Sequence, residues 1–480
     1  MKKLLILFTA LLSILTFGCS TDADEPNALV ESITENAVIS ALVPSYYSGI
    51  MHSGDYVYPV SFSFKETDLI TRDPTVYYKD FSKMGIVLAT DIYETSRIEF
   101  TNKKSPSANN DKLTVFETLG FSDAEFHEAG NGAVEDLRDT ENFVISHKAV
   151  QYNNEDYELF ILSLRGTDSV TQWTSNFDVG SDTTEYYTIT GTHSDWTNKK
   201  EHKGFSVAAK RVDALVQSYI AAHTTTGAKK IIYLTGHSRG AAIANILGAK
   251  YETSGAFEKT FAYTFAAPYT TTIDEADNTY KTVFNILNSD DAVVIMPPQQ
   301  WGFTRYGITK KVSVKNNVNL STRWYELFSK GLADANGFYQ SAGAEDPVFE
   351  ASLAGISSDR DHLYTVGSNE DDLFKMTFES NEAATNARTD LQNLLVLQYA
   401  NISITSENGK YVLSGYIAPA FYMQILSNLI TKNTNDTNPL DGIMYEKFIK
   451  PTGYMIAAAT YHGFEKSHQM ATYYLLAEEF

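Results

Sequence analysis

The residues with the clearest chemical potential lie in the pentapeptide at 236–240, which has the form G-x-S-x-G. A short apolar run precedes it at 231–234, and a stretch of small and apolar residues follows. This context predicts a strand, a turn too tight for larger side chains beside it, and a helix. Such a turn lifts the serine hydroxyl above the end of the sheet, where it can attack a carbonyl carbon. We therefore expect Ser238 to be a nucleophile and Gly236 and Gly240 to be its elbow glycines.

A serine nucleophile needs a base that takes its proton and an acid that orients the base. In α/β-hydrolases both follow the serine, the acid first and then a histidine. Asp290 and Asp291 come directly after an apolar run at 282–287, so either could place a carboxylate at the end of a strand. His202 and His237 precede the serine. We expect His202 to position the helix after it and His237 to pack beside the sheet.

Three histidines follow these aspartates, namely His362, His462 and His468. We expect His468 to be the base because it stands just before a final amphipathic stretch at 468–479, where a late loop can deliver it to the sheet. His362, which lies in a polar stretch, is the alternative base. His462 is the least favoured of the three.

The hydrophobic pattern alternates between helical and strand-like segments, which predicts an α/β fold with a mostly parallel central sheet flanked by helices. The expected elements are a helix at 77–93, a hairpin of strands at 143–152 and 157–165, a helix at 204–222, a strand at 231–234, a helix at 239–252, strands at 260–266 and 282–287, a hairpin around Asn408-Gly409 and a helix at 468–479.

Several segments besides the serine motif resemble the class 3 (fungal-type) lipase family, an α/β-hydrolase family. They occur in the family's order over about residues 140–305, and they comprise Leu164–Thr167 followed by Trp173, His202–Phe205, Phe265–Pro268, and Asn288–Val293 followed by Pro297-Pro298. His468 and Tyr473 form a further H-x-x-x-x-Y segment that is similar to the surroundings of the catalytic histidine in some relatives.

The resemblance implies roles for individual residues. Asp291 keeps the family's spacing and is favoured over Asp290 as the acid. Thr167 and Arg239 correspond to the oxyanion-hole residues, which donate backbone N–H groups, and Thr167 could add its hydroxyl. A lid over the acyl site would lie within 168–201.

Apolar surface for such a lid would come from Val170, Trp173, Phe177 and Val179. The chain departs from the family at Arg239 and Ala241, where leucine and glycine are frequent, and in a long segment between Trp173 and His202. These departures bear on the class of substrate more than on the type of reaction.

The first residues have the form of an export signal. Lys2 and Lys3 precede an apolar run, Leu4–Phe17, that is too short for a permanent membrane anchor. The run ends at Cys19, the only cysteine, in a sequence that resembles a bacterial lipobox. We expect residues 1–18 to be a signal peptide, Cys19 to carry a lipid anchor and residues 19–35 to be a flexible tether. Ser20 favours the outer membrane or cell surface over the inner membrane.

Beyond the tether, we expect a hydrolase core with an N-terminal extension at 36–309, an inserted or cap subdomain at 310–455, and a C-terminal segment at 456–480 that returns to the core. The net charge of −21 argues against nucleic-acid binding. No metal or cofactor is expected, and the oligomeric state stays open.

The function expected from these features is that of a serine carboxylic ester hydrolase of the lipase type, acting on acylglycerols or related lipid esters. The alternatives are a phospholipase or an esterase on other acylated substrates, or a non-catalytic surface lipoprotein that binds a glycan or a protein.

Overall fold

The computed structural model describes residues 37–44, 57–101, 114–121, 123–129, 141–167, 176, 200–273, 275–297, 299, 302–328, 343–344, 364–366, 373–378, 380–385, 388–389, 403–416 and 465–480. The predicted signal peptide, anchor and tether at 1–35 lie outside these residues. So do the lid candidates Val170, Trp173, Phe177 and Val179. Among the helices that the structure describes, none is both long and apolar enough to span a membrane.

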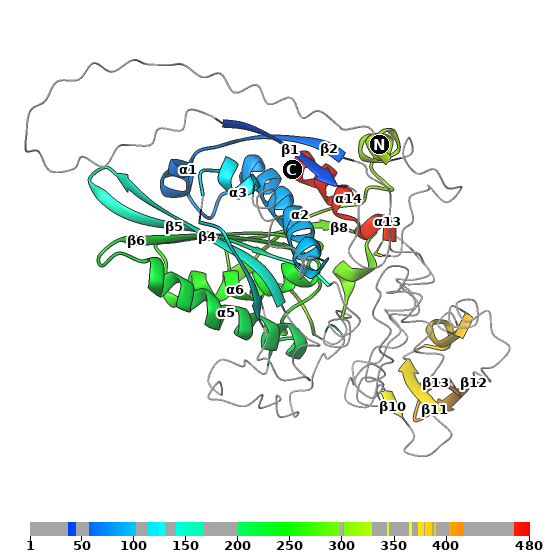
Figure 1. The fold of residues 1–480 in the computed structure, drawn as a ribbon. Coiled ribbons are helices and arrows are strands. Elements are labelled where there is room, and N and C mark those ends of the chain that lie inside the picture. Colours follow the sequence, from blue (N-terminus) through cyan, green and yellow to red (C-terminus); the bar gives the residue numbers. More distant parts are fainter. Residues whose placement is uncertain are drawn as a thin grey trace, which may run out of the picture. The chain divides into compact units, whose positions relative to one another are not determined.

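The largest sheet in the described part of the chain has seven strands (Figure 1). Its strands, in spatial order, are β3 (Glu125–Ala129), β4 (Glu141–Tyr152), β5 (Glu155–Leu164), β6 (Lys229–His237), β7 (Lys259–Phe265), β8 (Val283–Asn288) and β9 (Ile308–Val312). The first three strands pair antiparallel, and every pair from β5 to β9 is parallel. The predicted mostly parallel sheet is therefore present.

Local sequence accounts for the strands of this sheet. Asn153 and Asn154 both have positive φ, 52° and 61°, as a two-residue hairpin turn between β4 and β5 requires. Residues 231–237 of β6 and all of β8 are buried, as expected for strands covered on both faces. The predicted hairpin and the three predicted strands are confirmed.

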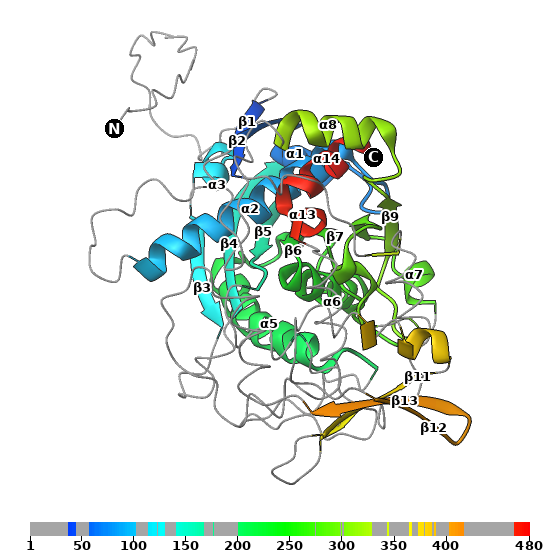
Figure 2. The ribbon, with the colours of Figure 1, turned by 90° about the vertical axis from the view of Figure 1, so that its right-hand side faces the viewer.

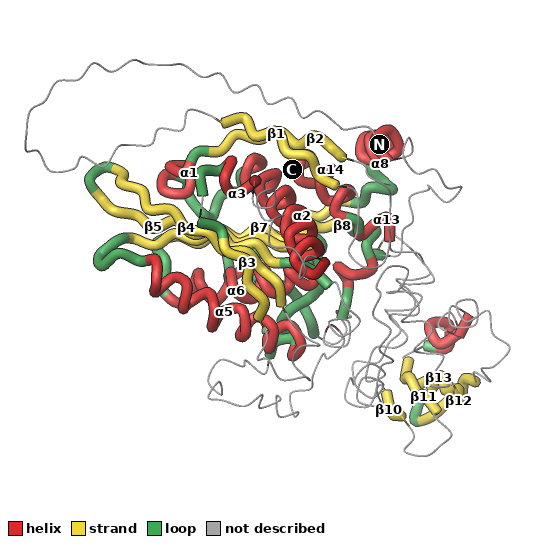
Figure 3. Tube along the Cα trace, in the orientation of Figure 1, coloured by secondary structure: helices red, strands yellow, loops and turns green. Residues whose placement is uncertain are grey.

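Helices cover both faces of the sheet (Figures 1 and 3). α5 (Lys203–His223) and α6 (Arg239–Ser254) lie on one face. α2 (Lys79–Thr101) and α14 (Met470–Glu479) lie on the other and run side by side (Figure 2). The helix expected at 468–479 is interrupted: α13 (Glu465–His468) ends at His468, and Gln469 is extended, with ψ 142°, before α14 begins.

The chain stays with the central sheet beyond residue 310, where we expected the insertion to begin. β9 continues to Val312, and α8 (Val318–Phe328) then packs on the C-terminal segment, where Trp324 Nε1 donates to Thr472 Oγ1 at 3.0 Å. The described part of the predicted insertion also contains a separate antiparallel sheet with a confirmed hairpin at Asn408-Gly409, in the order β10 (Tyr364–Val366), β11 (Leu373–Phe378), β13 (Lys410–Tyr416) and β12 (Ser403–Glu407).

The remaining elements are short or peripheral. They are an antiparallel pair, β1 (Ala37–Pro44) and β2 (Val57–Phe64), the helices α1 (Glu66–Thr71), α3 (Thr114–Thr118) and α7 (Ala276–Thr279), and the 3-10 helix η2 (Ala292–Ile295).

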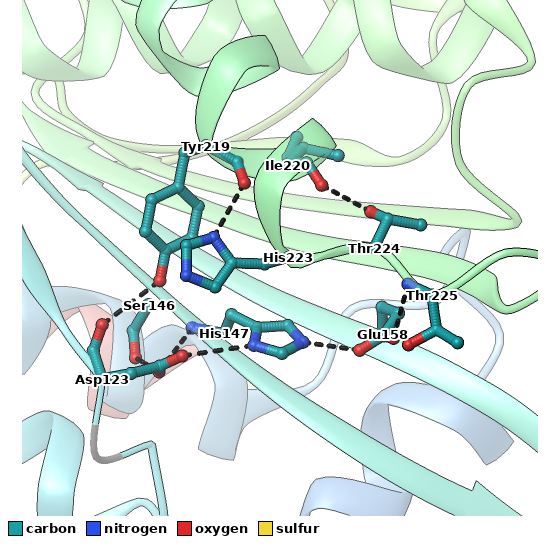
Figure 4. Close-up of polar contacts among 9 residues, drawn as sticks. All are labelled: Asp123, Ser146, His147, Glu158, Tyr219, Ile220, His223, Thr224 and Thr225. Carbon is teal, nitrogen blue, oxygen red and sulfur yellow. Dashed lines mark hydrogen bonds and ion pairs between the residues drawn. The ribbon is translucent and has the colours of Figure 1, made fainter.

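A polar cluster fastens the end of α5 to β4 and β5 (Figure 4). His147 lies between two carboxylates, with Nδ1 3.2 Å from Asp123 and Nε2 2.5 Å from Glu158. Glu158 also accepts from the backbone of Thr225, just after α5. Burial alone would raise the pKa of Glu158, but the hydrogen bonds from His147 and Thr225 outweigh it and lower that pKa. Glu158 is the fourth residue of β5, so this cluster is far along the strand from the carboxyl end that carries the site described next.

Candidate active site

The predicted nucleophile occupies a strained turn between β6 and α6. Ser238 has φ 58° and ψ −123°, a backbone conformation that residues other than glycine rarely adopt. Its backbone N–H donates to Phe265 O at 2.9 Å, which ties the turn to β7. A Cβ on Gly236 would come within 2.5 Å of the carbonyl carbon of Gly240, so the steric reason for the elbow glycines holds.

Three side chains from distant parts of the chain meet at this turn. His468 Nε2 lies 3.0 Å from Ser238 Oγ, and His468 Nδ1 lies 2.6 Å from Asp291 Oδ2. All three residues are buried. A carboxylate can only accept, so Nδ1 of His468 carries the proton and Nε2 of the neutral ring is left to accept from the serine hydroxyl. We refer to Ser238, His468 and Asp291 as the triad.

Of the two adjacent aspartates, the structure brings Asp291 to the histidine. Asp291 Oδ1 accepts from Val293 N at 2.9 Å and caps η2, which leaves Oδ2 facing His468. Asp290 faces the turn after β9 instead, where it accepts from Ser313 Oγ at 2.6 Å and from Lys315 N at 2.8 Å.

The alternative bases His362 and His462 lie outside the described residues. His202 has the position expected for it: it is the N-cap of α5, and its Nδ1 accepts from Phe205 N at 3.4 Å.

The backbone around His468 is held by buried side chains. His237 Nε2 lies 3.0 Å from the carbonyl oxygen of His468, and Asn288 Nδ2 donates to Ser467 O at 3.1 Å. Burial and the nearby His468 ring lower the pKa of His237 well below its usual value, so His237 is neutral and donates through Nε2. Beyond packing beside the sheet as expected, His237 therefore tethers the segment that delivers the base.

A third partner of the acid was not assigned a role from sequence. Tyr473 OH donates to Asp291 Oδ2 at 2.7 Å, so this oxygen accepts from both the tyrosine and the histidine. The H-x-x-x-x-Y spacing marked Tyr473 as part of a motif. Its partner depends on how the C-terminal segment docks on β8, which spacing does not reveal.

The two predicted oxyanion-hole residues follow paired strand ends. Leu164 at the end of β5 pairs with Gly236 on β6, and the side chain of Asn176 hydrogen-bonds both Thr167 Oγ1 and Arg239 Nη1. A Cβ on Gly240 would overlap the carbonyl oxygen of Leu164, so this glycine permits the close approach. Thr167 and Arg239 are both buried.

The side chain of Arg239 enters a buried ion pair that the sequence did not reveal. Its Nε donates to Glu141 Oε2 at 3.0 Å, and its Nη2 donates to the other oxygen of the same carboxylate. Its Nη1 donates to Asn176 Oδ1 at 2.7 Å, and Asn176 Nδ2 donates to Thr167 Oγ1 at 2.7 Å. Glu141 is 98 residues from Arg239, and no motif in the sequence marked it.

The chemistry available here is acyl transfer by a serine with an oriented histidine. The described residues hold no group of three or more His, Cys, Asp or Glu side chains that could bind a metal ion.

Comparison with known proteins adds a family match. Residues 161–301, from β5 to just beyond η2, match the model of the family Lipase (class 3). This segment contains Ser238 and Asp291, whereas His468 lies beyond it. No curated protein matches the chain at a significant level.

The chain is also similar to solved structures of lipases. They include a fungal lipase–inhibitor complex (17% identity, TM-score 0.32, covering 49% of this chain and 80% of that one), lipase II from Rhizopus niveus (19%, 0.31, 47% and 80%) and mono- and diacylglycerol lipase from Aspergillus oryzae (16%, 0.32, 48% and 77%). The fold itself rests on the strand order and the elbow described above. The family match shows that residues 161–301, which contain the elbow and Asp291, are similar to the class 3 lipase family.

Proposed function

We propose that this chain is a carboxylic ester hydrolase of the lipase type, which cleaves acylglycerols or related lipid esters through an acyl-enzyme on Ser238. The observation that carries the proposal is the buried hydrogen-bond chain from Ser238 Oγ through His468 to Asp291 Oδ2. The family match at 161–301 supports the lipase class.

In the proposed first step, Ser238 Oγ attacks the ester carbonyl carbon while His468 Nε2 takes the hydroxyl proton. The carbonyl electron pair moves to the oxygen and forms an oxyanion. His468 then gives its proton to the departing alcohol, which leaves an acyl-enzyme. A water molecule attacks the acyl group in the same way and releases the carboxylic acid. Asp291 holds the ring and balances its positive charge.

The oxyanion needs donors that are in place before the charge develops. We propose the backbone N–H groups of Arg239 and Thr167 for this role. The support is that Arg239 follows Ser238 in the chain and that both residues hydrogen-bond the side chain of Asn176. In comparable sites one such donor contributes about 3–4 kcal/mol to the stability of the transition state.

The test is hydrolysis of p-nitrophenyl esters with short to long acyl chains by wild type, Ser238→Ala and His468→Ala. Ser218→Ala is the matched control, since Ser218 is exposed on α5. We expect Ser238→Ala and His468→Ala to lower kcat by about 10⁴-fold or more and the control to keep it.

The preferred chain length then separates a lipase from a short-chain esterase, and phospholipid substrates test the phospholipase alternative. A wild type that cleaves none of these esters but binds a glycan or a protein would contradict the catalytic proposal.

We further propose that the chain is exported and anchored through a lipid on Cys19 in the cell envelope, at the outer membrane or cell surface. The support is the signal-like sequence at 1–18 and the lipobox-like sequence before the single cysteine. We also propose that 168–201 contains a lid with Val170, Trp173 and Phe177 on its apolar side, and that most of 310–455 is an insertion.

A further inference from the structure

The side chain of Arg239 is the starting point, because its burial has no explanation in the acyl-transfer steps. Its exposed fraction is 0%, and that of its partner Glu141 is 1%. Removing two charges from water costs free energy that their attraction barely offsets, so such a pair is weak evidence for a purely stabilising role. The pair lies directly beside the nucleophile, since Arg239 follows Ser238 in the chain.

The chemistry of the groups fixes which atom donates and which accepts in the hydrogen bonds that connect this ion pair to Thr167. A guanidinium can only donate, so the group of Asn176 that faces Arg239 Nη1 at 2.7 Å must be its oxygen. The amide NH2 of Asn176 then faces Thr167 Oγ1 at 2.7 Å. An amide NH2 also only donates, so the Thr167 hydroxyl accepts this bond and directs its own O–H hydrogen elsewhere.

The position of Thr167 indicates where that hydrogen can act. Thr167 follows the carboxyl end of β5 and Arg239 that of the paired strand β6, so both lie past the edge of the sheet at which Ser238 stands, with Asn176 hydrogen-bonded to both. If Asn176 had its amide reversed, the Thr167 hydroxyl would have to donate to Asn176. The charge of Arg239 excludes that arrangement, and the carboxylate of Glu141 balances this charge.

We propose that the Glu141–Arg239 ion pair, acting through the Asn176 amide, orients the hydroxyl of Thr167 as a hydrogen-bond donor to the oxyanion. The family resemblance already implies that the Thr167 hydroxyl could serve as a donor, and the new element is the set of groups that hold it in position. Glu141, Arg239 and Asn176 are positioning residues that do not contact the substrate. The inference rests on the proposed acyl transfer at Ser238. No proton is transferred in it, because the hydroxyl only donates a hydrogen bond.

The first experiment is a double-mutant cycle on Thr167→Val and Asn176→Leu, which keep the approximate shape of each side chain. We expect Thr167→Val to lower kcat about 10²-fold and Asn176→Leu about 10-fold, with KM nearly unchanged. In the double variant kcat should equal that of Thr167→Val alone, because Asn176 acts only through the hydroxyl. Thr167→Ser should restore most of the activity.

A boronic acid that forms a tetrahedral adduct with Ser238 provides a second readout. Its affinity should fall in each variant by the same factor as kcat/KM, since both report on the charged tetrahedral state. If Asn176 has a purely structural role, the fold-loss of kcat in the double variant should equal the product of the fold-losses in the two single variants. That result would overturn the inference. Wild-type kcat in Asn176→Leu would overturn it as well.

The contribution of the ion pair is tested by removing both charges together, as Glu141→Gln with Arg239→Met. Single changes would leave a buried charge without its partner and could unfold the chain. We expect the pair variant to lose as much kcat as Asn176→Leu, with no further loss when all three changes are combined.

Asp213→Asn with Lys250→Met is the matched control, because this ion pair joins α5 and α6 away from Ser238. It should lower thermal stability and leave kcat unchanged. Wild-type kcat in the Glu141→Gln/Arg239→Met variant would overturn the role of the pair.

Failure of this inference can be told apart from failure of the proposed function. If wild type has no esterase activity that depends on Ser238, the proposed function and the inference about Thr167 are both contradicted. If wild type is active and loses activity with Ser238→Ala, but the cycle is multiplicative, only the inference falls.

Discussion

Three consecutive residues of the nucleophile elbow each hold a different part of the site. His237 binds the backbone carbonyl of His468, Ser238 contacts the ring of the same histidine, and the side chain of Arg239 binds Glu141. The residues at the two variable positions of the G-x-S-x-G motif, His237 and Arg239, therefore each have a defined partner in this chain. A tight turn projects successive side chains in different directions, so neighbours in sequence can reach partners far apart in the fold.

A buried carboxyl group at Glu201 leads to a prediction about pH. Glu201 accepts from Ser206 Oγ at 2.6 Å and Tyr306 OH at 2.9 Å, which links α5 to the segment before β9. Burial raises the pKa of Glu201 to about 7, although both hydrogen bonds act against the rise. The folded chain therefore keeps this proton up to about pH 7, whereas the unfolded chain loses it near pH 4.5.

The free energy of unfolding should consequently decrease as pH rises between these two values and level off above about pH 7. Glu201 contributes a slope of at most about 1.4 kcal/mol per pH unit. We expect Glu201→Gln to remove this contribution. The check is urea unfolding of wild type and variant from about pH 5 to about pH 8. Unfolding curves with the same pH dependence in both proteins would contradict the assignment.

At the scale of elements, the site depends on how closely α6 approaches the end of β5. Gly240, in the first turn of α6, touches the backbone of Leu164 and Arg165. This contact fixes the distance between the segment that carries Thr167 and the one that carries Ser238. Gly248, further along α6, touches Ala262 on β7 and Val283 on β8, away from the triad.

These two glycines provide a matched pair of variants. Gly240→Ala should displace the end of β5 and lower kcat by about 10²-fold even where the chain folds, because the proposed oxyanion donors would move. Gly248→Ala brings a Cβ to 2.8 Å from Ala262 Cβ and should destabilise the fold by about 1–3 kcal/mol. Activity per folded molecule should persist in Gly248→Ala. Kinetics with titration of active sites separates the two effects, and equal kcat in both variants would contradict the argument.

At the scale of the whole molecule, the last residues of the chain complete the site. The segment 465–480 supplies His468 and Tyr473, and it is held by Asn288, His237 and Trp324 from three other parts of the chain. α14 packs between α2 and β8. The position of His468 at Ser238 therefore depends on contacts with the sheet, with α2 and with α8.

The proposed anchor at the other end of the chain can be tested independently of catalysis. In a bacterial host, labelled palmitate should be incorporated into wild type and into the control Ser20→Ala, and both should fractionate with membranes. Cys19→Ala should take up no label and leave the membrane fraction, because Cys19 is the only cysteine. If Cys19→Ala takes up no label but still fractionates with membranes, the anchor proposal is contradicted.

The sequence by itself determined the features that depend on local physics. The elbow glycines, the positive φ at Asn153 and Asn154, and the hydrophobic periods of α5 and β6 are consequences of steric and solvation effects between near neighbours. The alternation of strands and helices was sufficient to predict the α/β fold, and the order of serine, acid and histidine typical of α/β-hydrolases then limited the candidates for the acid and the base.

Only the tertiary structure decided which groups meet. Asp290 and Asp291 are adjacent and chemically identical, and they are distinguished by the direction each takes after β8. The partnership of Glu141 with Arg239 and that of Tyr473 with Asp291 span 98 and 182 residues. Such pairings follow from strand register and from the docking of the C-terminal segment. Both are set by the packing of the whole core, which local sequence does not determine.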